Sequence, residues 1–283
     1  MGTSTSSAGA GSGSPFDPPW LDSASGSIDS GQADTLISPG EGGEEAEAGG
    51  DGTAPESEGG PTLAPPARYQ EARRLLTGFA KSGDSSALRR GIGSFVRKGM
   101  GGSTRAASRM QTTSMAAASL GGFLSALRDG GDQSISTWAD SLKQRQLSAN
   151  EVALEVVKKL LPGGGSIDEE AAKNAMELAI SKLYEVTPDV DIFRLTDDQI
   201  ANVMAYTIAF DVFNRVQLEL GRVFEKLRYS ARVIQERFSQ ALDYITTVVE
   251  EAMCGARAGT TARTMREVAS YALQQALFVF GEA

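Results

Sequence analysis

Residues 196–227 read TDDQIANVMAYTIAFDVFNRVQLELGRVFEKL, and apolar side chains recur through them at intervals of three and four. This spacing predicts an α-helix, because residues three and four apart share one helical face. The apolar stripe comprises Ile200, Val203, Met204, Ile208, Val212, Val216, Leu220, Val223 and Leu227, and it is widened by Phe210, Phe213 and Phe224. A helix with so wide an apolar surface is expected to be buried on two sides.

Two more helical stripes follow towards the C-terminus, from Ile234 to Met253 and from Met265 to Phe280. Three helix starts carry the capping-box spacing, in which a hydroxyl caps a free amide and a Glu or Gln side chain reaches back. These pairs are Ser148 with Glu151, Ser166 with Glu169, and Thr196 with Gln199. Short connections favour antiparallel neighbours, so the sequence predicts an all-α helical bundle over 148–283.

The segment 67–128 has a helical pattern of its own and a basic, glycine-containing composition. The expected helices cover about 67–80, 84–98 and 103–128, with a loop at 99–102. Gly121 and Gly122 are expected to allow close packing or a kink. Together with the bundle, this segment is predicted to form one helical domain, 67–283, with the alternative that 67–128 packs as a subdomain of its own.

Residues 1–66 are rich in Gly, Ser, Pro, Ala and acidic side chains. Such a composition cannot bury enough apolar surface to offset the entropy of ordering, so we predict a disordered tail. Eleven of the 36 acidic residues and none of the 27 Lys and Arg lie here, which leaves 25 acidic residues in the remainder. The aromatic residues Phe16 and Trp20 are interpreted either as partner-binding anchors or as chance residues of a linker.

The chain contains no histidine and one cysteine, Cys254. Without histidine, the commonest general base, the Ser-His and Cys-His nucleophile systems and most zinc ligand sets are excluded. We therefore expect a non-enzymatic protein with no cofactor and no metal. Cys254 is expected to be a buried structural thiol. No apolar leader or long apolar run is present, which indicates a cytoplasmic protein that does not bind a membrane.

Two patterns resemble binding sites but lack an essential part. The acidic cluster consists of Asp189, Asp191, Asp197 and Asp198. It fails the calcium-loop spacing because Phe193 stands where an oxygen ligand is needed, so the charges after Thr196 are interpreted as helix-stabilising. The glycine-rich segment 91–104 lacks the Gly-Lys-Ser/Thr ending of a Walker loop.

Residues 68–109 hold ten basic side chains against Glu71 and Asp84. Such a surface can bind phosphates, face solvent or attract the acidic tail. The candidate nucleic-acid-binding residues are Arg89, Arg90, Arg97, Lys98, Arg105 and Arg109. Aromatic groups for base stacking are limited to Tyr69, Phe79 and Phe95.

Four short motifs support a family resemblance. They are Met1-Gly2-Thr3-Ser4-Thr5-Ser6, Pro15-Phe16-Asp17-Pro18-Pro19-Trp20, Phe95-Val96-Arg97-Lys98-Gly99-Met100-Gly101-Gly102 and Leu120-Gly121-Gly122-Phe123-Leu124. Together they resemble the QatB family of the bacterial four-gene Qat anti-phage defence system.

The resemblance implies a non-enzymatic adaptor in a defence complex. The implied partners are a QatA-like ATPase, a QueC-like enzyme of the 7-deazaguanine synthase type and a TatD-like nuclease. It also implies that the QueC-like partner attaches a deazaguanine group to the N-terminus, at Gly2. A flexible tail suits that reaction, because a modifying active site can accept it without unfolding a core.

Overall fold

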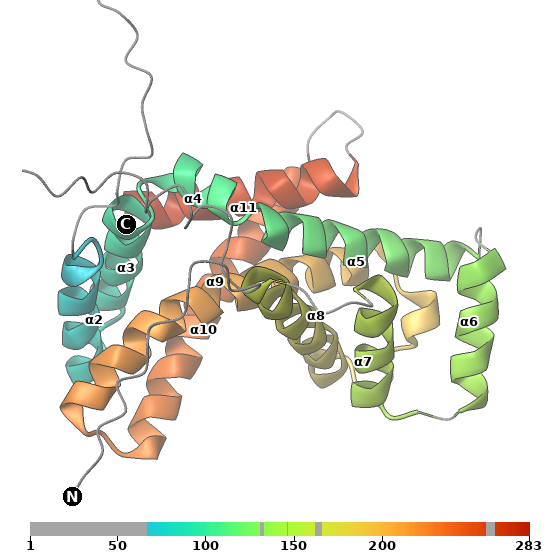
Figure 1. Ribbon diagram of the computed structural model, residues 1–283, viewed down its shortest axis with the longest axis horizontal. Coiled ribbons are helices and arrows are strands. Elements are labelled where there is room, and N and C mark those ends of the chain that lie inside the picture. Colours follow the sequence, from blue (N-terminus) through green and yellow to red (C-terminus); the bar gives the residue numbers. More distant parts are fainter. Residues whose placement is uncertain (1–66, 131–132, 146, 162–165, 259–263) are drawn as a thin grey trace, which may run out of the picture. The chain divides into compact units, whose positions relative to one another are not determined.

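The computed structural model describes residues 67–283 except 131–132, 146, 162–165 and 259–263. The predicted tail, 1–66, therefore lies outside the described residues. Within the described part the backbone forms ten α-helices and no strand, which confirms the predicted all-α class (Figure 1).

The α-helices are α2 (Gln70–Ser82), α3 (Ser85–Ser94), α4 (Ser103–Arg109), α5 (Gln111–Asp129), α6 (Gln133–Gln144), α7 (Ala149–Leu160), α8 (Ile167–Val186), α9 (Asp197–Leu227), α10 (Ala231–Arg257) and α11 (Met265–Glu282). A π-helix, η1 (Phe95–Gly99), follows α3, and a 3-10 turn, η2 (Ile192–Arg194), precedes α9.

Helix α9 is the centre of the fold. It packs against α8, α10, α5 and α2, which explains its wide apolar stripe. Residues 203–209 are buried without interruption. Because seven residues make nearly two helical turns, this part of α9 is covered on every side. The expected two-sided burial is therefore confirmed.

The predicted helix starts are confirmed in detail. Ser148, Ser166 and Thr196 each accept a hydrogen bond from the backbone amide three residues later, and the Glu or Gln there reaches back. Helix α9 ends at Leu227, and the next residue, Arg228, takes a left-handed conformation with φ of 49°.

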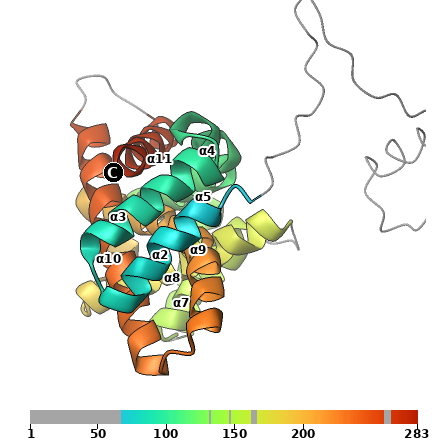
Figure 2. The same cartoon turned by 90° about the vertical axis from the view of Figure 1, so that its left-hand side faces the viewer.

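The basic N-terminal helices pack onto the bundle. Helices α2 and α3 lie side by side as a hairpin (Figure 2). Asp84 begins α3 by accepting hydrogen bonds from the amides of Ser86 and Ala87. Helix α2 also packs on α9, and α3 packs on α11. The hairpin thus contacts helices that are more than a hundred residues away in sequence.

Two sequence-based expectations were wrong, and one helix was not predicted. The helix expected over 103–128 is interrupted at Met110, a buried residue whose amide bonds to the carbonyls of both Ala106 and Ala107. Helix α6 was not expected at all. Cys254 is exposed, because it lies one helical position beyond the buried Met253, on the outer face of α10.

No helix in the described ranges is both long and apolar enough to cross a bilayer.

Candidate anion-binding cleft

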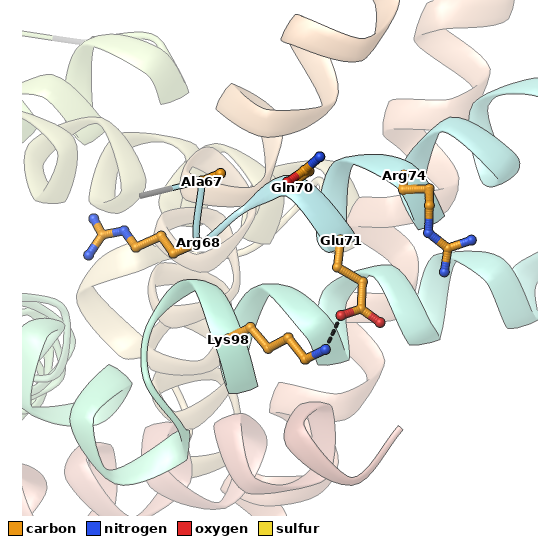
Figure 3. Close-up of a pocket in the computed structure, with 6 residues that line it drawn as sticks. All are labelled: Ala67, Arg68, Gln70, Glu71, Arg74 and Lys98. Carbon is orange, nitrogen blue, oxygen red and sulfur yellow. Dashed lines mark hydrogen bonds and ion pairs between the residues drawn. The ribbon is translucent and has the colours of Figure 1, made fainter. Parts of the chain in front are cut away.

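An open cleft of about 680 Å³ lies where the described chain begins (Figure 3). Its lining residues come from the start of α2 and from η1, and they are Ala67, Arg68, Gln70, Glu71, Arg74 and Lys98. Glu71 and Arg74 are three residues apart within α2, so they share one side of that helix, whereas Arg68 lies in the turn that precedes it.

Positive charge dominates this cleft. Lys98 Nζ donates a hydrogen bond to Glu71 Oε2 across it. That bond, and then the charges of Lys98, Arg74 and Arg97, hold the pKa of the Glu71 carboxyl below its ordinary value. Arg68 completes the set, with its guanidinium 4.8 Å from the centre of the Tyr69 ring. We refer to Arg68, Arg74, Arg97 and Lys98, arranged about Glu71, as the cation cleft.

The π-helix presents the two cations that follow α3. Phe95 and Val96 are buried whereas Arg97 and Lys98 are exposed. Arg97 Nη1 is fixed by donating to the carbonyl oxygen of Gly281 at 2.5 Å. A π-helical turn accommodates one residue more than an α-helical turn, so it changes which residues of this segment face the core.

Glycines in this segment serve packing and chain reversal. A Cβ atom at Gly99 would overlap the Tyr69 ring, so only glycine fits beside it. Gly101 and Gly102 have φ of 85° and 95°, which reverses the chain into α4. These roles account for the glycine-rich pattern of this loop through packing and backbone geometry.

The six basic residues selected from the sequence do not all lie at one site. All six are exposed, but only Arg97 and Lys98 belong to the cation cleft. Arg89 lies with its guanidinium 5.5 Å from the centre of the Tyr244 ring, and Arg109 donates to the carbonyl of Met100 at 3.1 Å. Arg90 lies near enough to Asp84 to help lower the pKa of that carboxyl.

Sequence analysis missed two members of the cleft, Arg68 and Arg74. The spacing of Arg74 from Glu71 was a usable signal, since residues three apart on a helix are neighbours, whereas Arg68 lies before the helix and had no such signal. What the sequence did not reveal is that Lys98 reaches the same carboxylate from η1.

The nearby aromatic residues are occupied by packing. Tyr69 stacks on Phe95 with ring centres 5.4 Å apart. Phe95 and Phe79 are buried in the core. Since base stacking requires an exposed ring face, the cleft is suited to recognise an anion by charge.

The acidic cluster near α9 is distributed among separate structural contacts. Asp191 accepts a hydrogen bond from the amide of Phe193 in η2. Asp197 pairs with Arg128 at 2.5 Å, and Asp198 pairs with Arg257 at 2.8 Å. In the part of the chain that the structure describes, no three Cys, Asp or Glu side chains gather as metal ligands.

Gly2, Phe16 and Trp20 lie outside the described residues. A family model described as "Qat anti-phage system associated protein QatB" matches residues 101–280. No curated protein and no solved structure matches the chain. The family match covers 180 of the 283 residues and includes the central helix α9 with its neighbours α5, α8 and α10. More than half of the sequence, and the helices that build the core, therefore place the chain in the QatB family of Qat anti-phage system associated proteins.

Proposed function

We propose that the chain is a non-catalytic adaptor, which binds other components of the Qat system and presents its N-terminal tail to one of them. Membership of the QatB family makes it a component of that defence system, and the family description names no catalytic activity. The observation that carries the adaptor role is an exposed apolar patch on α11, formed by Phe278 and Val279.

Helix α11 exposes two neighbouring apolar side chains near its C-terminal end, although its other exposed residues are mostly polar. Its inner face buries Ala272, Ala276 and Phe280 against the bundle. On the outside, Phe278 is 52% exposed and Val279 is 45% exposed. Large apolar side chains exposed side by side are typical of interaction sites, so this patch supports contact with a partner protein. We assign this patch to a protein component of the system, with the QatA-like ATPase as the expected partner.

Affinity capture from cells that express the whole system tests this assignment. Aromatic anchors at interfaces contribute about 2 kcal/mol or more, so Phe278→Asp is expected to reduce capture of the partner at least tenfold. Val186→Asp is the matched control, because Val186 is 59% exposed at the end of α8. Equal capture by the two variants would remove α11 from the interface.

The tail supplies the second part of the proposal. We propose that the QueC-like partner attaches a deazaguanine group to Gly2, and that Phe16 and Trp20 anchor the tail on a partner. The resemblance of residues 1–6 and 15–20 to the family motifs supports these roles. The nuclease of the system is expected to be TatD-like.

Mass measurement of the N-terminal tryptic peptide tests whether Gly2 is modified. Because residues 1–66 contain no Lys or Arg, trypsin leaves the N-terminus on one peptide that ends at Arg68. A mass increase on that peptide is expected only when the QueC-like partner is co-expressed. An unchanged peptide mass would rule out the proposed modification of Gly2. The adaptor role would then still be tested by affinity capture.

Substitution of both aromatic anchors tests tail docking. Phe16→Ala with Trp20→Ala is expected to weaken partner capture without changing the urea midpoint of unfolding. Unchanged capture counts against docking through these residues.

A second candidate function is contact with nucleic acid. Four cations around one carboxylate in the cation cleft favour it. Phosphate contacts would make binding fall steeply with salt, with a logarithmic slope of about −0.7 to −0.9 per contact. An apolar adaptor interface depends much less on salt, so a salt series separates the two functions.

A further inference from the structure

We propose that a second cleft, between the start of α8 and the second half of α9, binds a partner polypeptide through a Lys or Arg and a large apolar side chain of that partner. We refer to it as the α9 cleft. This inference rests on the proposed adaptor role and deepens it, because it adds a docking surface separate from the exposed patch on α11.

The α9 cleft is open, measures about 690 Å³ and has apolar side chains at its surface. Ile167, the first residue of α8, is 90% exposed, and Leu218 of α9 is 69% exposed. Among the described residues these are the two most exposed large apolar side chains, and both line this cleft. Phe238 of α10 lines it as well. Large apolar side chains that gather at one hollow of the surface are typical of an interaction site.

The α9 cleft has room for an inserted side chain. Gly221 lines it three residues after Leu218, so the two residues are neighbours on one side of α9. A Cβ atom at Gly221 would meet no other atom within 4 Å. The space beside Leu218 is therefore left open by the fold, and an apolar side chain of a partner can occupy it.

The α9 cleft also contains a carboxylate oxygen that lacks a hydrogen-bond donor. Asp211 lines the cleft and is 1% exposed. Its Oδ2 accepts hydrogen bonds from Thr113 and Arg215, whereas its Oδ1 is buried and has no hydrogen-bond partner among the described residues. An unsatisfied buried acceptor is costly, so a donor that enters from the cleft is stabilised by supplying the missing bond.

The charge of the lining favours a cationic donor. The lining holds three carboxylates, those of Asp168, Asp211 and Glu225, and two guanidinium groups, those of Arg215 and Arg222. Arg215 is shared between Asp168, at 3.0 Å, and Asp211, at 3.3 Å. Arg222 is paired with Glu219, which is not part of the lining. This excess of negative charge favours Lys or Arg over a neutral donor and disfavours a nucleic acid.

The two contacts set the spacing of the partner's side chains. Asp211 and Leu218 are seven residues apart on α9, which is about 10 Å along the helix axis. The partner must therefore hold its cation about 10 Å from its apolar side chain. This distance corresponds to about seven residues of a helix or about three residues of an extended segment.

Site-specific cross-linking identifies the partner segment. Benzoylphenylalanine is placed at position 218 of the full chain in cells that carry the whole Qat system, and the cross-linked peptides are sequenced by mass spectrometry. The expected result is a cross-link to another polypeptide of the system, with Lys or Arg within about seven residues of the attached position. Benzoylphenylalanine at position 186 is the control, because Val186 is also exposed but lies at the other end of α8, and it is expected not to attach to that segment.

Binding of that segment, as a synthetic peptide, to the purified full chain tests whether the cleft is the site. Gly221→Met fills the open space and is expected to weaken binding at least about tenfold. Gly255→Met is the matched control, because Gly255 is exposed on α10 and also has open space at its Cβ position, and the affinity should not change. Met has a higher helix propensity than Gly, so both variants are expected to fold.

A double-mutant cycle tests the contact with Asp211. Asp211→Asn is expected to weaken peptide binding about tenfold, because one hydrogen bond between charged groups is lost. Replacement of the peptide's Lys or Arg by Met should cause a similar loss, and the two changes together should cost little more than either alone. Additive losses would overturn the pairing of the cation with Asp211. Gly221→Met still tests the cleft if Asp211→Asn does not fold.

Three further results would overturn the inference, and they differ in what they mean for the adaptor role. If other polypeptides of the system copurify with the chain but position 218 does not attach to them, or if Gly221→Met and Gly255→Met bind the peptide equally, the cleft is not a docking site and the adaptor role stands. If no other polypeptide copurifies, both proposals fail. If position 218 attaches to the chain itself, the cleft binds a second copy.

Discussion

Arg73 of α2 and Glu219 of α9 form an ion pair in which Arg73 Nε lies 2.5 Å from Glu219 Oε2, although 146 residues separate them. The side chain of Glu219 is 7% exposed, and Arg222 Nη1 approaches its other oxygen at 2.8 Å. This pair joins the basic hairpin of α2 and α3 to the centre of the bundle. It also fixes the helix that carries Glu71 and Arg74 of the cation cleft.

Removal of this pair is expected to destabilise the fold. Arg73→Met leaves the buried Glu219 with one cation, and a buried charge that loses a partner costs about 1–3 kcal/mol. Arg74→Met removes the neighbouring charge, which is exposed, and should change the free energy of unfolding by less than about 0.5 kcal/mol. Urea unfolding of both variants measures the difference. Equal midpoints would show that the pair does not stabilise the contact between α2 and α9.

Two adjacent glycines of α5 are expected to respond oppositely to alanine. A Cβ atom at Gly121 would overlap the buried side chain of Met204, as the expected close packing requires. Gly121→Ala should therefore destabilise the fold by about 1–2 kcal/mol. Gly122 has open space at its Cβ position, so Gly122→Ala should stabilise α5 by about 0.5–1 kcal/mol. Thermal unfolding compares them, and a stabilising Gly121→Ala would contradict the packing of α5 on α9.

The buried hydroxyl of Thr113 is expected to stabilise the carboxylate of Asp211 in α9 through a hydrogen bond. Thr113 Oγ1 donates to Asp211 Oδ2 at 2.5 Å, and Arg215 Nε donates to the same oxygen at 3.3 Å. Thr113→Val keeps the shape but removes the donor, which should cost about 1–3 kcal/mol in the free energy of unfolding. Thr113→Ser is the control and should recover most of the loss. If valine and serine behave alike in urea, the hydrogen bond contributes nothing.

The Glu71 pair is expected to make stability depend on pH. Its pKa is lowered in the folded chain, first by the hydrogen bond from Lys98, so folding favours the ionised carboxylate. The resulting stabilisation is present above the unfolded-state value of about 4.3 and is lost as the pH falls through the folded-state value. Native protein should thus be more stable than Glu71→Gln at pH 7, and the difference should shrink as the pH falls below about 4.3. Urea midpoints measured along a pH series test this, and a difference that does not shrink on acidification would contradict the pairing.

Local signals predicted much of the fold. A hydroxyl residue followed three positions later by Glu or Gln marks the starts of α7, α8 and α9, because both halves of a capping box lie within one helical turn. The apolar stripe of α9 predicted burial on two sides, because the spacing of three and four residues that defines the stripe is also a local pattern.

What the sequence did not predict depends on contacts between distant residues. Helix α6 has few buried residues of its own, and Trp138 packs edge to face against Phe123 of α5, with ring centres 5.3 Å apart. The cation cleft forms only because Gly99 lets η1 approach Tyr69, which brings Lys98 to Glu71. Neither contact leaves a periodic pattern in the sequence.

The central claim is that this chain functions by binding other components of the Qat system. Light scattering after size-exclusion chromatography, on the tagged chain purified from cells that carry the whole system, tests it most directly. The account predicts a particle with at least one further polypeptide of the system and a mass well above the 29.7 kDa of the chain. A particle of 29.7 kDa with no other polypeptide, from cells that the system protects against phage, would contradict it.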